Sequence, residues 1–280
     1  QARRDELAAR LDRWLLWLAV FALVAAAALG GLAIVLIYYS FPQAYLAAAR
    51  ALPRSRFWPF GAMELAFSWG CFIFAAMLPM SVSRFYFVVR WLVTAFGCSN
   101  LIYHFPPLFV MLGVLSARPK TWGGDLRFTT LLSDPEVQAR SAHHLLAALA
   151  VTGMAIACYG VRRGDEAEKA IAWGARLAAA ALLCQLFSGL WLVMTMPVGS
   201  RQLLFGDDAV AGVLFAGSLL GTFLVLPRVA AAALGHVERR ATMLTILLVL
   251  AIVTLMTATR HRTRNLLIGS SETRQANAGP

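Results

Sequence analysis

The chain has 280 residues, of which 60% are hydrophobic and only 14% are charged, with a formal net charge of +11. A soluble domain carries roughly 25% charged residues, so this composition excludes an ordinary soluble protein and indicates an integral membrane protein. The positive charge is almost wholly arginine in short loops beside hydrophobic segments, which argues against a nucleic-acid partner.

The hydrophobic segments predict an all-α, polytopic transmembrane helix bundle. Residues 1–13 are expected to form an amphipathic segment at the membrane interface. One transmembrane domain follows over 14–260, and a polar, frayed tail covers 261–280. Each span is near or above the roughly 20 residues that cross a bilayer. The seven spans are expected at 14–40, 58–80, 85–116, 142–160, 170–196, 209–233 and 241–259.

Seven spans place the two termini on opposite faces of the membrane, which we call face Y (N-terminal) and face X (C-terminal). The loops are short except 117–141, which contains the aromatic and charged stretch 120–125. Arginine and lysine are common at both faces, so the positive-inside rule gives no orientation. The cysteines form no C-x-x-C or C-x-x-C-H pair, so neither a covalently attached c-type haem nor an iron–sulfur cluster is supported.

The polar run from Asp134 to His144 leads directly into the fourth span. A histidine just inside a membrane helix is costly to leave in lipid, so it usually faces protein, water or a cofactor. Axial ligation of haem iron through a ring nitrogen is one use of such a residue. The alternative is that His143 and His144 are interfacial residues hydrogen-bonded near headgroups.

Helical rise of about 1.5 Å per residue converts sequence position into membrane depth. His143 then shares the face-X end of the bundle with a carboxylate, a second histidine and three thioethers. Haem irons are commonly held by His/Met or His/His pairs from different helices. The candidates at this depth are Glu64, Met194, Met196, Met256 and His261.

His104 lies deeper, roughly 18 Å from face X, and cannot share an iron with His143. Pro106 and Pro107 follow it, remove two backbone donors and predict a kink. The kink fits a cofactor pocket or a water-filled cavity. It also fits a structural bend in which the histidine bonds a freed carbonyl.

Glu64 is the only acid inside a hydrophobic span. An intramembrane carboxylate is expensive, so we expect it to face the bundle interior and to act as a proton relay, a haem contact or a quinol acceptor. The alternative is a protonated carboxyl bonded to a neighbouring helix.

Several of these stretches resemble cytochrome bd quinol oxidase subunit I. The run from Pro135 to Gly153 is similar to the haem-bearing helix of that family. Glu64 lies in a helix like the one that carries the family's haem-contacting glutamate. Three further stretches fit in order: Gly97-Cys98-Ser99-Asn100-Leu101, Gln185-Leu186-Phe187-Ser188-Gly189 followed by Met196-Pro197, and the ending Met256 to Arg262, which is closer to shortened relatives found beside c-type cytochromes.

The chain also departs from that family. Its first span has no histidine, so the ligand expected for the high-spin haem of the oxygen-reducing pair is missing. Only Val198 to Asp208 separates spans five and six, so the long quinol-binding loop is absent, as is the Gly-Arg-Gln-Pro-Trp motif. Oxygen reduction by this chain alone is therefore not expected.

The resemblance implies a low-spin b haem on His143, with Met256 as its second ligand because the family draws a methionine from a late helix. Arg140 is expected to neutralise haem propionates, and quinone chemistry is expected nearby. Face X would lie at the periplasm of a bacterial inner membrane, where a c-type cytochrome or another subunit of a respiratory complex would exchange electrons with the chain.

Two other readings stay open. The chain could be a haem-free structural subunit whose arginines bind lipid headgroups or partner subunits. It could also be a small transporter with Glu64 and His104 as a proton relay, although no repeat relates its halves.

Overall fold

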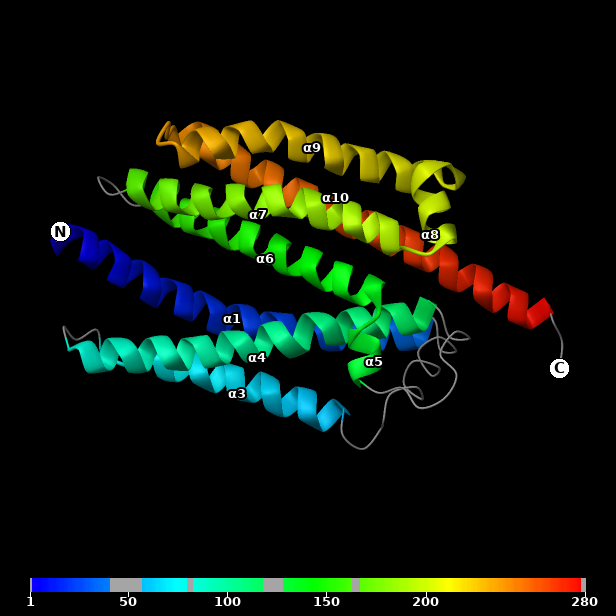
Figure 1. Cartoon of the computed structure of the whole chain (residues 1–280), viewed down its shortest axis with the longest axis horizontal. Helices are drawn as coiled ribbons and strands as arrows, with labels where there is room; N and C mark the ends of the chain where they lie inside the picture. Colours follow the sequence, from blue (N-terminus) through cyan, green and yellow to red (C-terminus); the bar gives the residue numbers. More distant parts are fainter. Residues whose placement is uncertain (1, 41–56, 80–82, 118–127, 163–166, 278–280) are drawn as a thin grey trace. The chain divides into compact units, whose positions relative to one another are not determined.

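A computed structural model describes residues 2–40, 57–79, 83–117, 128–162 and 167–277, and within these ranges every regular element is a helix (Figure 1). This confirms the all-α prediction. The stretch 120–125 of the long loop lies outside the described residues. The chain divides into two compact units, residues 1–132 and 133–280, and the single transmembrane domain expected over 14–260 stays a prediction.

Unit 1 contains α1 (Ala2–Ser40), α3 (Phe57–Met77), α4 (Arg84–Ala117) and the short α5 (Phe128–Leu132). Helix α3 contacts both α1 and α4, and its Phe72 and Ala75 pack with Leu16 and Val20 of α1. Helix α1 is continuous from Ala2, so the expected interfacial segment 1–13 is the first part of the same helix that forms span one. Helix α4 is likewise one helix across Pro106 and Pro107, so the prolines do not end it.

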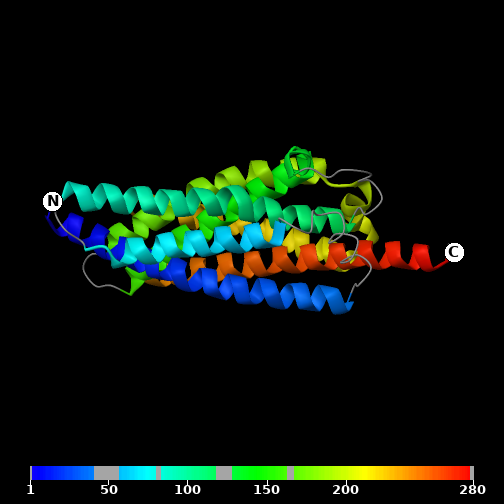
Figure 2. The same ribbon diagram turned by 90° about the horizontal axis from the view of Figure 1, so that it is seen from below.

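Unit 2 contains α6 (Pro135–Val161), α7 (Ala167–Thr195), α9 (Ala209–Ala233) and α10 (Arg239–Asn277). The short α8 (Val198–Gln202) and the π-helix η1 (Leu203–Asp207) connect α7 to α9 (Figures 1 and 2). The core is built mainly from small and β-branched residues of all four long helices, which allows close helix packing. It comprises Ala150, Met154, Ala175, Ala178, Ala181, Leu182, Val225, Val229, Ile246 and Val249.

The C-terminal tail differs from the prediction. Residues expected to be frayed over 261–280 continue helix α10 as far as Asn277. Part of the reason is tertiary contact, because Leu267 lies against α8, with its Cδ2 3.6 Å from where a Cβ on Gly199 would be. Arg262 also pairs with Asp208 at 2.9 Å, which ties this stretch of α10 to the start of α9.

Two aspartates fix helix starts at the face-X end of unit 2. Asp134 caps α6 by accepting hydrogen bonds from the backbone N–H groups of Glu136 and Val137, and Pro135 occupies the first helical position. Asp208 caps α9 in the same way through Ala211 N–H. These caps place the histidine-bearing start of α6 and the start of α9 at defined positions.

Among the described residues, six helices are long and apolar enough to cross a membrane, and α3 contributes a shorter apolar stretch, Gly61–Met77. Together they correspond to the seven predicted segments. Large side chains such as Phe21 (66% exposed), Phe87 (69%) and Phe187 (75%) point outward from their helices. Such exposure is unfavourable in water and ordinary in lipid, so the chain is a multi-pass membrane protein.

Candidate functional site

His143 is directed toward α7. Its Nδ1 lies 3.2 Å from Ser188 Oγ, and its Nε2 lies 3.5 Å from Gln185 Nε2. The Ser188 hydroxyl is buried and donates its own proton to the carbonyl of Gln185 at 3.2 Å. We call these three residues the His143 cluster.

The protonation of His143 follows from this geometry. The Gln185 amide nitrogen that faces Nε2 is a donor, and Ser188 Oγ, which faces Nδ1, is an acceptor when its proton goes to the Gln185 carbonyl, so both contacts fit the tautomer protonated at Nδ1. A neutral imidazole protonated at Nδ1 carries its lone pair on Nε2. The contact from the Gln185 amide to Nε2 is at the long limit for a hydrogen bond. The cluster therefore presents a nitrogen lone pair of the kind that ligates metals.

His144 faces a different helix. Its Nε2 lies 3.1 Å from Nη1 of Arg260 on α10. Because a guanidinium only donates hydrogen bonds, this nitrogen of His144 is an acceptor and the ring is neutral. Adjacent residues of a helix point about 100° apart, which agrees with His143 meeting α7 and His144 meeting α10.

The contacts of His143, His144 and Arg262 join α6, α7, α9 and α10 at one end of unit 2. This agrees with the depths predicted for these helices at face X. Of the predicted axial partners, Met256 and Met196 are partly buried, whereas Met194 is 70% exposed and His261 is exposed and bonded to Asn265 of its own helix. The His143–Met256 pairing stays a prediction.

Arg140 lies in a pair with Glu136 one turn earlier on α6. Its Nε and Nη2 donate to Glu136 Oε1 at 2.8 and 2.5 Å, and the Glu136 side chain is only 4% exposed. One edge of the Arg140 guanidinium is therefore used within the helix. The propionate role stays a prediction.

Unit 1 holds a second polar cluster, formed by Glu64 and Ser68 of α3 with Asn100 and His104 of α4. Nδ1 of His104 lies 3.2 Å from Glu64 Oε1 and 3.1 Å from Asn100 Oδ1. Asn100 donates its amide to the Glu64 carbonyl at 3.0 Å and to Ser68 Oγ at 2.9 Å. We call these four residues the Glu64 cluster.

The Glu64 side chain is 16% exposed, so the prediction that this carboxylate faces protein is confirmed. Both neighbours of His104 Nδ1 are oxygen acceptors, so this nitrogen carries a proton. The cluster thus links a carboxylate and an imidazole across two helices, which is an arrangement able to hold or pass a proton.

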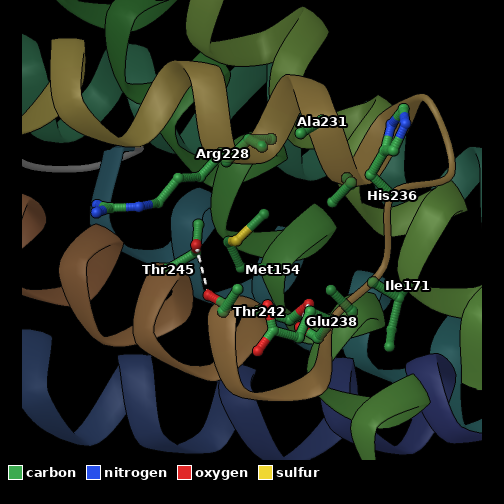
Figure 3. Close-up of a pocket in the computed structure, with 13 residues that line it drawn as sticks. Met154, Ile171, Arg228, Ala231, His236, Glu238, Thr242 and Thr245 are labelled. Carbon is green, nitrogen blue, oxygen red and sulfur yellow. Dashed lines mark hydrogen bonds between the residues drawn. The ribbon is translucent and has the colours of Figure 1, made fainter.

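A cavity of about 230 Å³ lies at the other end of unit 2 and is lined largely by apolar side chains of α6, α7, α9 and α10. Figure 3 draws the residues that line it. The Arg228 guanidinium and the His236 ring lie at opposite ends of this view, with the Met154 sulfur between them. Thr242 and Thr245 use their hydroxyls on carbonyls of Glu238 and Ala241, in or just before α10. The polar groups do not converge, so the cavity is not the candidate site.

The contacts of Ser188, Gln185 and Asn100 with the two clusters were not predicted from the sequence, although each residue lies in a stretch that carries the family resemblance. The pairing of α10 with α6 through Arg260 was not predicted either. Arg260 and Arg264 are four residues apart and so share one side of a helix, but this spacing does not indicate which helix that side contacts.

Comparisons of the chain with protein-family models, with curated proteins and with solved structures find no match, so the family resemblance depends on the residues quoted from the sequence.

Proposed function

We propose that the chain is a b-type cytochrome-like subunit of a membrane electron-transfer complex, with haem b held by Nε2 of His143. The observation that carries this proposal is the His143 cluster. Metal-ligating histidines usually donate their second ring N–H to a fixed acceptor, which sets the tautomer and raises ligand basicity. Ser188 supplies that acceptor, held in turn by its bond to the Gln185 carbonyl.

The donor set of unit 2 fits such a group. Binding of iron to Nε2 of His143 would displace only the 3.5 Å contact with the Gln185 amide. The partly buried Met256 lies on another helix of the same unit. When bound, haem b would carry one electron at a time through its iron. The role of Ser188 and Gln185 is then to keep the imidazole neutral and oriented.

The family resemblance supplies the expected partners, namely quinol as electron donor or acceptor and a c-type cytochrome or other subunit at face X. Quinol oxidation releases protons with its electrons, so a proton acceptor near the quinone is needed. The Glu64 cluster supports this part of the proposal, because its carboxylate is paired with an imidazole inside a membrane helix pair.

A haem-free structural subunit is the second candidate. The contacts of His143 with Ser188 and Gln185 also favour this candidate, because they give both ring nitrogens partners within the chain. His144 and His104 are hydrogen-bonded as well. In such a subunit the histidines would serve as hydrogen-bond partners for polar groups inside the bundle and would hold neighbouring helices together.

Spectroscopy separates the two candidates. The full chain, purified from a haem-replete bacterial host, is expected to show a reduced-minus-oxidised spectrum of low-spin haem b. Its pyridine haemochrome should be that of protoporphyrin without thioether links. A preparation without a Soret band would refute the cytochrome proposal and support the structural subunit.

Variants locate the ligand. His143→Ala should remove the low-spin signal, whereas the control His236→Ala, at an exposed position, should leave it unchanged. Ser188→Ala should keep haem but raise its midpoint potential, because loss of the acceptor makes the imidazole a weaker donor to Fe(III). If His104→Ala alone abolishes the signal, the haem site is in unit 1 and His143 is the wrong residue.

A further inference from the structure

Three arginines gather where α6 meets α10 in unit 2. Arg140 is on α6, and Arg260 and Arg264 are one turn apart on the same side of α10. Arg260 Nη1 lies 3.1 Å from Nε2 of His144, and Arg140 is four residues before His144 on the same side of α6, so Arg140 lies beside this contact. Arg264 follows one turn after Arg260, and like charges placed this close repel one another. We call Arg140, Arg260 and Arg264 the arginine cluster.

The charge of Arg260 is not balanced by an acid of the described chain. Its guanidinium donates a hydrogen bond to His144, which is a neutral acceptor and brings no negative charge. A carboxylate close to the cluster is that of Glu136. Its Oε1 accepts hydrogen bonds from both Nε and Nη2 of Arg140. Arginine stays protonated in proteins, so Arg260 cannot relieve the repulsion by losing its proton.

The cluster is also positioned to meet an anion. Arg260 directly follows the last residue of the predicted span 241–259, and Arg140 lies two residues before the first residue of the predicted span 142–160. This depth corresponds to the boundary between the acyl chains and the headgroups, where the phosphates of lipids are found. The α6 N-terminus adds a partial positive charge at the same end.

We propose that the arginine cluster binds the phosphate group of an anionic phospholipid, with Arg260 as the main contact. A guanidinium matches phosphate geometry and binds it through paired hydrogen bonds, and basic sites between transmembrane helices are suited to such headgroups. His144 and Glu136 act as positioning residues, because each fixes the direction of one guanidinium. This site does not depend on the presence of haem.

The test is thermal unfolding of the full chain in a zwitterionic detergent, with added phosphatidylglycerol, phosphatidylcholine or inorganic phosphate. Phosphatidylglycerol near one hundred times its Kd should raise the unfolding midpoint by roughly 5 to 10 °C, and phosphatidylcholine should not. Arg260→Gln should remove at least half of that rise. The matched control is Arg240→Gln, which changes an exposed arginine at the opposite end of the same helix.

Equal lipid-induced shifts in Arg260→Gln and Arg240→Gln would overturn the proposal. If inorganic phosphate alone raises the unfolding midpoint and this rise depends on Arg260, the site binds a free anion. That result would refute the proposal that a lipid supplies the phosphate group. If Arg260→Gln does not fold, Arg260→Lys keeps the charge but loses the paired hydrogen bonds, and it should weaken lipid retention in native mass spectrometry at least fivefold. Unchanged retention in Arg260→Lys would refute a phosphate contact at this residue.

Discussion

The close contact between α6 and α7 predicts a large effect of one methyl group. Gly153 of α6 and Gly174 of α7 face each other, and a Cβ on Gly153 would lie 2.5 Å from the Gly174 carbonyl oxygen and 2.7 Å from Ala178 N. These neighbours are backbone atoms, which cannot rotate away. Ordinary van der Waals contact begins near 3.4 Å, so Gly153→Ala requires the two helices to separate by about 0.9 Å at the crossing.

The cost can be estimated from the core around the crossing. Ala150, Met154, Ala175 and Ala178 are buried there, and a radial gap of 0.5–1 Å forfeits about a quarter to a half of each dispersion contact. Overpacking of this kind costs about 1–3 kcal/mol, and we expect the upper part of that range because the obstacles are backbone.

The assay is unfolding of the purified chain in mixed micelles with increasing denaturing detergent, followed by circular dichroism. The control is Gly217→Ala on α9, whose new methyl group would meet only Leu255 Cδ1 at 3.9 Å. That variant should be neutral or slightly stabilised, because alanine is the better helix former by about 0.5–1 kcal/mol. Should Gly153→Ala prove as stable as Gly217→Ala, the close α6–α7 crossing would be refuted.

Three other predictions concern polar contacts. In a double-mutant cycle, Glu64→Gln and His104→Ala should couple by roughly 1.5–3 kcal/mol, the range for hydrogen bonds to charged groups, and additive effects would contradict their 3.2 Å contact. Hydrogen bonds from Arg262 and from backbone N–H groups lower the pKa of Asp208 below 3.8. This stabilisation is complete above the unfolded pKa and is lost as the pH falls through the lowered folded pKa, so Asp208→Asn should flatten the acid limb of the unfolding midpoint below about pH 4. Asp134→Ala should cost about 1 kcal/mol by removing the α6 cap, whereas Asp134→Ser should be nearly neutral in the same unfolding assay.

The positions of the apolar helices could be predicted from the sequence alone. A bilayer requires about 20 apolar residues per helical span, and the lengths and hydrophobicity of 142–160, 170–196 and 209–233 express that requirement directly. The start of α6 was also readable, because Asp134-Pro135 is a local capping signal. The placement of Glu64 against protein followed from the cost of a carboxylate in lipid.

Which helices meet was decided only by the tertiary structure. Depth along a helix follows from counting residues, but rotation about the helix axis depends on packing with neighbours. Counting residues along the helices therefore placed His143 and Met256 at the same end of the bundle. Only the packing of the helices decided that the His143 ring contacts Ser188 and that Arg260 donates a hydrogen bond to His144. The continuation of α10 through the polar tail was missed for the same reason. Its sequence beyond Arg264 resembles a solvated end, and contacts such as Leu267 against α8 and Arg262 with Asp208 exist only once the four long helices of unit 2 have assembled.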